Sequence, residues 1–235
     1  MTFDFDYRLA VLTHGNMETL NQTLDSFFAH VSPRPSEVFV YADGVSAADR
    51  RAWMESRDLD DRFHLRFGPD QQGFCVATGM LWRWVSEPPD PYVFWLEHDF
   101  EFLRDVDLRE LAVVLDSDHR LAQMALVRGA ANPKERDAGG LIESRPGEFD
   151  QMCGVYDGRF VHPTPPWLRH RAFFTTNPSL MRRRLMAERP WPMDGRGSCE
   201  GRYGIDLVAA GYEFGFWGAG EPWVEHIGVR NGFGY

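Results

Sequence analysis

The chain has 235 residues and a formal net charge of −10, with 43% hydrophobic and 14% aromatic residues. This length and apolar content suit one folded domain, and the negative charge argues against indiscriminate binding to nucleic-acid phosphates. No apolar run approaches the roughly 20 residues of a membrane helix, and the N-terminus lacks the features of a signal peptide. Cys75, Cys153 and Cys199 match neither a disulfide framework nor a zinc site, because they are odd in number and widely spaced. We therefore predict a soluble, cytoplasmic protein.

Short apolar runs alternate with amphipathic stretches through the first half of the chain. Leu20, Leu24 and Phe27 recur at helical spacing, which predicts a helix with one buried face. Strand–helix–strand units of this kind form right-handed crossovers, so we expect an α/β fold with a mostly parallel central sheet and helices on both faces. The predicted elements are strands at 8–12, 38–42, 63–67, 92–96 and 122–127, and helices at about 20–31, 47–57, 74–85 and 108–115.

The second half of the chain is less regular. Glycine, proline and charged residues predict a long irregular loop at 132–167, and loops of that length in compact domains are usually functional or mobile. The predicted elements after it are strands at 172–176, 214–217 and 223–227, and helices at 177–187 and 203–210. No clean linker interrupts the chain, which predicts a single domain over 1–235 with an elaborated C-terminal half.

Two acids end the most apolar of the predicted strands. The run 92–96 leads into Glu97-His98-Asp99 at the carboxyl end of the strand, where open α/β sheets place their ligands. Side chains alternate along an extended chain, so Glu97 and Asp99 are expected on one side and His98 on the other. Converging carboxylates suit a hard divalent cation such as Mg²⁺ or Mn²⁺. A solvated pair of acids is the alternative that this motif alone leaves open.

Further motifs follow in an order that extends over nearly the whole chain. Their order resembles that of the GT-A glycosyltransferases of the family-2 type, which belong to the nucleotide-diphospho-sugar transferases. The motifs that carry the resemblance are Leu12-Thr13-His14-Gly15-Asn16, Asp43-Gly44-Val45-Ser46, Gln71-Gln72-Gly73, the DXD-like Glu97-His98-Asp99, Asn177-Pro178-Ser179 with Arg182-Arg183, Cys199-Glu200, Gly211-Tyr212 and His226-Ile227-Gly228. The resemblance implies a GT-A domain with a nucleotide-sugar-binding half at 1–130 and an acceptor-binding half at 131–235.

The resemblance also implies a metal-dependent sugar transfer. A nucleotide-diphospho-sugar, with a UDP-sugar favoured, would be the donor, and Mn²⁺ or Mg²⁺ would neutralise the leaving diphosphate. Asp99 is expected to be the firmest metal ligand, with Glu97 binding directly or through water and His226 adding an imidazole. An ordinary half-buried histidine at a strand end is the alternative for His226.

The resemblance further assigns residues to the donor nucleotide. Thr13, Asp43 and Gly73 are expected to line its pocket, although an Asp-Gly pair also forms turns without any ligand. Where the family often has an arginine that meets the diphosphate, this sequence has Thr78. Arg83, on the same predicted helix, is the candidate to replace that arginine.

An inverting transferase needs a carboxylate that takes the proton of the acceptor hydroxyl. Glu200 matches the first acid of the family's Glu-Asp motif, but Gly201 stands where the second acid belongs. Asp206 is therefore the second candidate for the base. A solvated loop acid is the alternative for Glu200.

The acceptor is not encoded in any motif of this sequence. A group of arginines between Arg159 and Arg189 predicts either a solvated helix face or a site for a phosphate-bearing acceptor, including a hydroxymethylated base in phage-type DNA. Trp167, Trp191 and Trp217 are candidates for stacking on a sugar or for core packing. Two other classes remain open, a nucleotidyltransferase and a non-catalytic nucleotide-sugar-binding module.

Overall fold

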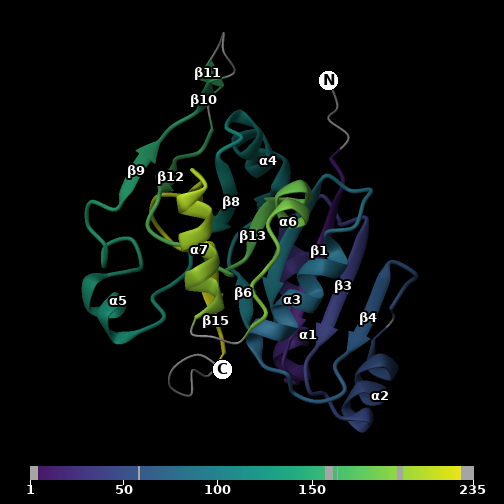
Figure 1. Ribbon diagram of the computed structural model, residues 1–235. Helices are drawn as coiled ribbons and strands as arrows, with labels where there is room; N and C mark the ends of the chain where they lie inside the picture. Colours follow the sequence, from purple (N-terminus) through teal and green to yellow (C-terminus); the bar gives the residue numbers. More distant parts are fainter. Residues whose placement is uncertain (1–4, 58, 157–160, 163, 195–197, 229–235) are drawn as a thin grey trace.

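A nine-stranded sheet runs through the residues that the computed structural model describes, which are 5–57, 59–156, 161–162, 164–194 and 198–228 (Figure 1). In their order across the sheet, its strands are β4 (Phe63–Phe67), β3 (Glu37–Ala42), β1 (Tyr7–Thr13), β5 (Tyr92–Glu97), β13 (Ser179–Arg182), β8 (Leu121–Leu126), β14 (Glu213–Trp217), β12 (Trp167–His170) and β9 (Phe149–Met152).

Helices and small strand pairs surround this sheet. The helices of the described part are α1 (Met17–His30), α2 (Ala47–Ser56), α3 (Phe74–Val85), α4 (Leu108–Ser117), α5 (Pro133–Ala138), α6 (Arg183–Glu188) and α7 (Cys199–Ala209). The small pairs join β15 (Val224–His226) to β6 (Phe100–Phe102), β2 (Val31–Ser32) to β7 (Val106–Asp107), and β10 (Val155–Tyr156) to β11 (Val161–His162). The predicted α/β class is confirmed.

The strand directions bring several carboxyl ends to one edge of the sheet. β4, β3, β1 and β5 are parallel neighbours, as predicted. β13 is antiparallel to both β5 and β8, so β8 points the same way as β5. The carboxyl ends of β3, β1, β5 and β8 therefore meet at one edge, which we call the carboxyl edge. Beyond β8 the sheet is mixed, because β14 is parallel to β8 and β12 is antiparallel to β14.

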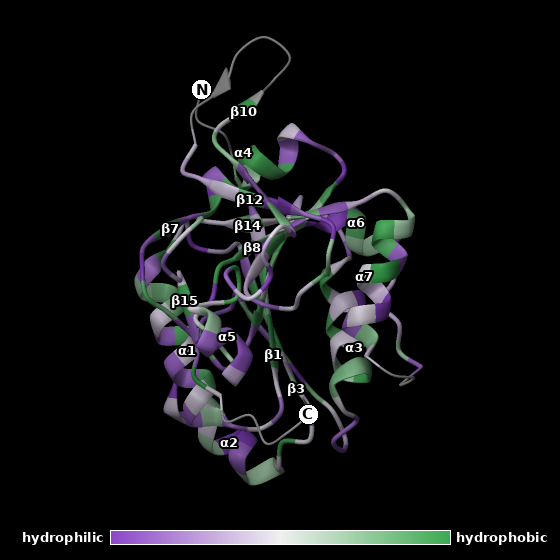
Figure 2. Ribbon diagram, turned by 90° about the vertical axis from the view of Figure 1, so that its left-hand side faces the viewer, coloured by the Kyte–Doolittle hydropathy of each residue, from purple (hydrophilic) through white to green (hydrophobic). Residues whose placement is uncertain are grey.

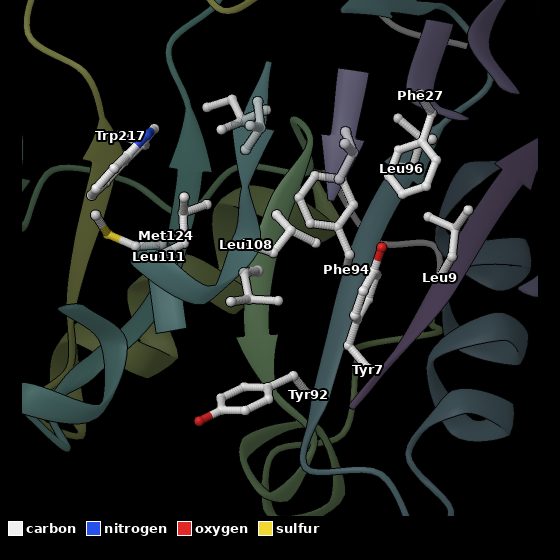
Figure 3. Close-up of a cluster of buried hydrophobic side chains, with 14 of the residues drawn as sticks. Tyr7, Leu9, Phe27, Tyr92, Phe94, Leu96, Leu108, Leu111, Met124 and Trp217 are labelled. Carbon is white, nitrogen blue, oxygen red and sulfur yellow. The ribbon is translucent and has the colours of Figure 1, made fainter. Parts of the chain in front are cut away.

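Alternation along the strands divides the core between two faces. Tyr7, Leu9 and Val11 of β1 pack into the cluster that contains α1 and α4, whereas Ala10 and Leu12 pack into the cluster of α3, α6 and α7. Figure 2 shows α1 on one side of the strands and α3, α6 and α7 on the other, and Figure 3 shows some of the side chains of the first cluster. The sheet is thus buried on both faces, which explains the continuous apolar runs of its central strands.

The structure corrects the prediction for the segment 172–187. Ser179–Arg182 forms β13, and the helix α6 begins only at Arg183, while 172–176 is not a strand. β13 fills the gap between β5 and β8 and pairs with both, and its Leu180 and Met181 are fully buried. The hydrogen bonds of β13 with both neighbouring strands therefore outweigh the preference for a helix start that Pro178 indicates. The predicted loop 132–167 also contains α5 and the short strands β9, β10 and β11.

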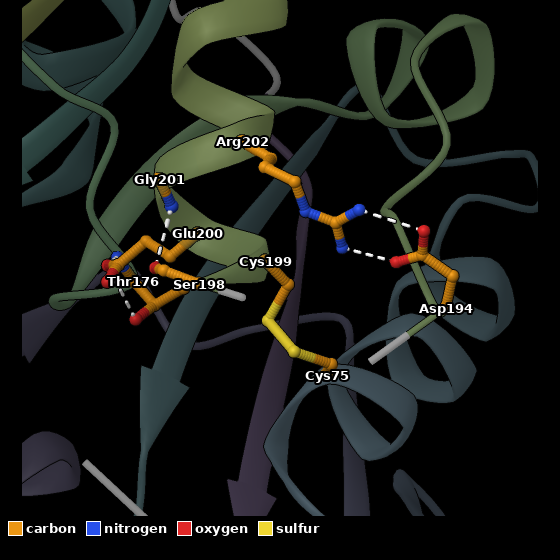
Figure 4. Close-up of a disulfide and its surroundings, with 8 residues drawn as sticks. All are labelled: Cys75, Thr176, Asp194, Ser198, Cys199, Glu200, Gly201 and Arg202. Carbon is orange, nitrogen blue, oxygen red and sulfur yellow. Dashed lines mark hydrogen bonds and ion pairs between the residues drawn. A yellow bond between two sulfur atoms is a disulfide. The ribbon is translucent and has the colours of Figure 1, made fainter. Parts of the chain in front are cut away.

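The structure contradicts the expectation that the cysteines form no disulfide. Cys75 and Cys199 are bonded, with their Cα atoms 5.8 Å apart and a sequence separation of 124 residues (Figure 4). The bond joins the first turn of α3 to the first residue of α7. In the chain-entropy account, closing a loop of this length stabilises the folded state by roughly 4–5 kcal/mol. Spacing alone could not reveal the pair, because the partners meet only through helix packing. Cys153 is exposed and unbonded.

The three tryptophans proposed for ligand stacking belong to the core. Trp167, Trp191 and Trp217 are 2%, 4% and 1% exposed, so they act as packing anchors. Within the described residues, no helix has both the length and the apolar character needed to cross a membrane.

A buried histidine makes the stability of the fold depend on pH. The His170 ring stacks on Phe216 and is also surrounded by Phe149, Phe173 and Phe214. Burial, assisted by the nearby charge of Arg145, lowers the pKa of His170 to about 4. In the unfolded chain His170 takes up a proton near pH 6.5. The stability that the buried neutral ring contributes to the folded state is therefore complete above that pH and is lost as the pH falls toward 4.

We expect His170→Phe to flatten this pH dependence, because the ring is kept and the titrating group is removed. Between pH 7 and pH 4.5 the wild type should lose about 2–3 kcal/mol more unfolding free energy than the variant. Urea unfolding at both pH values measures the difference, with His119→Gln on the surface as the control. Equal losses in wild type and His170→Phe would contradict the assignment.

Candidate active site

Residues at three neighbouring strand ends line a pocket at the carboxyl edge. Thr13 ends β1, Asp43 follows β3, and His98 follows β5. All three side chains are buried, at 1%, 2% and 3% exposure. The lining also includes Leu12, His14, Gln71, Gly73, Phe74 and Ala77, and we call this site the strand-end pocket. Its volume is about 20 Å³, and it is partly open to solvent.

Asp43 holds the loop that leads into α3. Its Oδ1 accepts a hydrogen bond from the Gln72 amide at 2.8 Å, and its Oδ2 accepts one from the Gly73 amide at 2.9 Å. Gly44 has a φ of +72°, and a β-carbon there would overlap the backbone and side chain of Gln71. Both carboxylate oxygens of Asp43 therefore hold this loop in place. This structural role could not be predicted from the sequence.

Asp99 and His226 form a buried pair beside this pocket. The Nε2 atom of His226 lies 3.0 Å from Oδ2 of Asp99, and their side chains are 13% and 9% exposed. The Ile227 amide donates to the Asp99 carbonyl at 2.8 Å, and a β-carbon at Gly228 would overlap the Asp99 carboxylate. Each residue of the His-Ile-Gly motif thus contacts Asp99.

Asp99 is ionised at neutral pH. Its burial favours the protonated acid, but the hydrogen bond from His226 and the charges of the nearby histidines outweigh burial and lower its pKa. Its Oδ1 is buried and has no hydrogen-bond partner among the described residues. A deprotonated carboxylate with one uncommitted oxygen beside an imidazole is a donor set that Mn²⁺ accepts.

Glu97 does not complete a three-ligand site with this pair. No group of three or more Asp, Glu, His or Cys side chains in the described part of the chain is arranged to hold a metal ion. Direct metal ligation by Glu97 therefore stays a prediction, while Asp99 and His226 are the two predicted ligands that the structure brings together. β5 ends at Glu97 and the chain turns before β6, so the strand alternation no longer relates Glu97 to Asp99.

His98 was expected to point away from the site, and instead it lines the strand-end pocket. Its amide donates to the Leu12 carbonyl at 3.0 Å, and its ring meets the edge of His14 with ring centroids 4.3 Å apart. Burial lowers the pKa of His98 to about 4, so the ring is neutral at pH 7. The apolar run ends at Leu96, which indicates that the strand is ending there. The alternation of side chains along a strand therefore does not predict the direction of His98.

Glu200 lies in the first turn of α7 and is held toward the sheet (Figure 4). Its Oε1 accepts hydrogen bonds from the Thr176 amide at 2.6 Å and the Thr176 hydroxyl at 3.0 Å. Asp206 is exposed and lies six residues further along the helix, or about 9 Å of axial rise. Of the two candidate bases, the structure directs Glu200 toward the carboxyl edge.

Arg83 lies far from the strand-end pocket. It is exposed in the last turn of α3, where its Nη2 is 3.8 Å from the Met193 sulfur. Ten residues separate it from Gly73, which corresponds to about 15 Å along the helix. Thr78, where the family often has an arginine, is fully buried. We therefore do not assign Arg83 to the diphosphate in the function proposed below.

The whole described chain superposes on a solved structure of GalNAc-T7 with UDP, GalNAc and Mn²⁺, with a TM-score of 0.71 and 12% identity, and covers 46% of that chain. It also resembles residues 1–349 of S. aureus TarS in complex with UDP-GlcNAc, with a TM-score of 0.64, 11% identity, and coverage of 97% of this chain and 60% of that one. Both neighbours are GT-A glycosyltransferases. The chain has the GT-A fold. No family model and no curated protein sequence matches it.

In this GT-A fold the chain spans 46% to 60% of the length of these neighbours. Its candidate residues follow the strand order along the carboxyl edge. Asp43 lies at β3, Thr13 at β1, and Asp99 after β5. Thr176, which holds Glu200, directly precedes β13, the next strand across the sheet. The strand-end pocket, the Asp99–His226 pair and the Glu200 carboxylate thus follow one another along the carboxyl edge.

The predicted basic group of the second half is largely neutralised in this GT-A fold. Arg169 and Arg171 both pair with Glu213, while Arg182 and Arg183 donate to main-chain carbonyl groups. Arg184 pairs with Glu188 at 2.7 Å, and Arg159 lies outside the described residues. Most of the described arginines of this group therefore form internal contacts, while Arg171 and Arg184 keep 67% and 82% of their side chains exposed.

Proposed function

We propose that the chain is a metal-dependent, inverting glycosyltransferase that moves a sugar from a nucleotide-diphosphate donor, first of all a UDP-sugar, to an acceptor hydroxyl. The observation that carries this proposal is the buried Asp99–His226 pair beside the strand-end pocket. The two solved neighbours with the same fold are complexes with UDP and with UDP-GlcNAc, and the GalNAc-T7 complex also contains Mn²⁺.

The donor set supports a metal that is shared with the substrate. Asp99 and His226 would hold Mn²⁺ or Mg²⁺, and phosphate oxygens and water would supply the remaining ligands, as is usual where a protein offers one or two side chains. The bound ion would stabilise the negative charge of the departing diphosphate. Glu97 is assigned an indirect role next to this pair, through water or the donor sugar.

Each remaining step is assigned to residues of the chain. Thr13, Asp43 and Gly73 would position the nucleoside in the strand-end pocket, with Asp43 keeping the Gln72–Gly73 loop in place. Glu200 would take the proton of the acceptor hydroxyl as its oxygen attacks the anomeric carbon. The bond from that carbon to the diphosphate breaks at the same time, which inverts the configuration and leaves a protonated Glu200.

A modified DNA base is a weaker acceptor candidate than a soluble glycan, protein or small molecule. The net charge is −10, and Arg169, Arg171 and Arg184 of the predicted basic group are paired with glutamates. A nucleotidyltransferase is also less well supported, because the turn after β1, Thr13-His14-Gly15-Asn16, contains only one glycine for a phosphate loop.

Titration calorimetry with UDP and Mn²⁺, followed by UDP-release assays over a panel of nucleotide sugars, tests the proposed function. We expect UDP to bind at least about tenfold more tightly with Mn²⁺ than with EDTA. UDP release from a donor should then require the metal. Binding without release from any donor would favour the non-catalytic module. The absence of nucleotide binding with metal present would contradict both enzyme classes.

A further inference from the structure

A second and larger cavity opens at the carboxyl edge, beyond the Asp99–His226 pair. We call it the β8 cavity, because its floor is the chain that continues from the end of β8. Its volume is about 420 Å³, which lies in the range of about 300–1,000 Å³ that is usual for small-molecule sites. The lining residues used below are Arg128, Gly129, Leu141, Glu143, Gly220 and Glu221.

The chain that leads into β15 connects this cavity to the metal-binding pair. The Trp223 amide donates to the Val127 carbonyl at 2.8 Å, and the Gly129 amide donates to the Val224 carbonyl at 3.0 Å. Pro222, which lines the cavity, is four residues before His226. Extended chain spans at most about 3.4 Å per residue, so their Cα atoms are no more than about 14 Å apart.

The candidate base lies between the cavity and the metal-binding pair. Thr176, which holds Glu200, belongs to the segment that enters β13 between β5 and β8. The Gln123 side chain of β8 donates to the Thr175 carbonyl at 3.1 Å, and the Leu126 amide donates to the Pro178 carbonyl at 2.8 Å. Because this segment is bonded to β8, Glu200 is held on the side of Asp99 that faces the cavity.

The charges around the cavity disfavour anionic ligands. Arg128 makes two hydrogen bonds to Glu135, at 2.7 Å and 3.1 Å, and both residues are buried. Burial would raise the pKa of Glu135, but the hydrogen bonds from Arg128 and the Ala131 amide lower it to about 2. Both members of this pair are therefore ionised, and their opposite charges cancel.

The remaining charges of the lining are acidic. Arg104 pairs with Glu221, so that arginine is also occupied. Glu143 forms no ion pair within the described part of the chain, which leaves the cavity with a small negative charge. The rest of the lining consists of aliphatic side chains and glycine backbone, including Leu141, Gly129 and Gly220. Aliphatic patches beside main-chain hydrogen-bonding groups suit a ring that has an apolar face and a rim of hydroxyl groups.

We propose that the β8 cavity binds the acceptor, and that this acceptor is a neutral or amino-bearing carbohydrate rather than a phosphorylated one. The inference rests on the proposed sugar transfer, because it places the attacking hydroxyl beside Glu200 and opposite the donor. It goes beyond that proposal by giving the acceptor a location and a chemical class.

Side chains introduced at two glycines provide the test. A β-carbon at Gly129 or Gly220 would meet no atom within 4 Å, and neither residue has a positive φ, so Gly129→Leu and Gly220→Leu should fill the cavity without straining the backbone. The matched control is Ala48→Leu on the exposed face of α2. The probes are the methyl glycosides of glucose, N-acetylglucosamine and glucosamine, with glucose 6-phosphate as the anionic counterpart.

Binding is measured by saturation-transfer NMR and calorimetry with UDP and Mn²⁺ present. We expect at least one methyl glycoside to bind the wild type and Ala48→Leu, and to bind Gly129→Leu and Gly220→Leu about tenfold or more weakly. The affinity for UDP with Mn²⁺ should stay within about twofold in every variant. Glu143→Gln should reduce the preference for the glucosamine glycoside over the glucose glycoside by about two- to fivefold.

Three results would overturn the inference: no binding of any methyl glycoside, tighter binding of glucose 6-phosphate, or unchanged glycoside binding in both leucine variants. Failure of the proposed function has a different signature. In that case UDP with Mn²⁺ would not bind the wild type, while glycoside binding and its loss in Gly129→Leu would persist.

Discussion

Asp99→Asn is expected to abolish sugar transfer while the fold remains intact. The substitution keeps the shape of the side chain and its contacts with His226 and Gly228, but it removes the negative charge that the metal requires. Loss of a metal that stabilises the leaving diphosphate costs several kcal/mol, so kcat should fall by about 10³-fold or more. Steady-state UDP release measures kcat, and calorimetry should show that Mn²⁺ no longer tightens UDP binding.

The chain offers a matched control for this variant. Asp105 forms a second Asp–His pair, with its Oδ1 2.9 Å from Nδ1 of His30, but its side chain is 91% exposed. Asp105→Asn removes the same charge from the same kind of pair and should leave kcat and the melting temperature unchanged. If Asp99→Asn kept wild-type activity, the metal assignment would be refuted.

The second large effect is expected for Glu200→Gln. Glutamine retains an oxygen that can accept the hydrogen bonds from Thr176, so the first turn of α7 should keep its position. It cannot take a proton, and the loss of a general base typically reduces the rate by about 10²–10⁴-fold. We expect this loss in kcat with saturating acceptor, and an unchanged Kd for UDP with Mn²⁺.

Asp206→Asn on the same helix distinguishes the two candidate bases. Asp206 is exposed, so its neutralisation should leave kcat within about twofold of wild type. The opposite pattern, with a large loss in Asp206→Asn and little in Glu200→Gln, would reassign the base. Comparable losses in both variants, accompanied by a lower melting temperature, would indicate that α7 itself had been disturbed.

The sequence predicted the first half of the fold better than the second. In the first half each predicted element is set by its own apolar pattern, and these patterns agree with the strands and helices of the structure. β13 depended on distant segments instead. Ser179–Arg182 follows a proline that suits a helix start, yet β5 and β8 both leave backbone groups that only a strand can pair. The residues around Ser179–Arg182 carry no local pattern that reveals these unpaired backbone groups of β5 and β8.

The site shows the same division. Asp99 could be proposed from an apolar strand followed by acids, and His226 from the His-Ile-Gly motif that carries the resemblance. The geometry between them could not be predicted, since it depends on the turn after Glu97, which brings His98 into the pocket. Arg83 shows the same problem, because a residue on the predicted helix can lie about three turns from the end that Asp43 holds.

Cys75 lies in the first turn of the helix whose leading loop Asp43 holds, and Cys199 directly precedes Glu200. One covalent bond thus connects the segment proposed to receive the nucleotide with the segment proposed to carry the base. Such bonds persist in oxidising surroundings and are opened where glutathione or thioredoxin is active. The thiol reductants routinely added to preserve enzymes would therefore remove the covalent connection between α3 and α7, and leave only their packing to hold these two segments together.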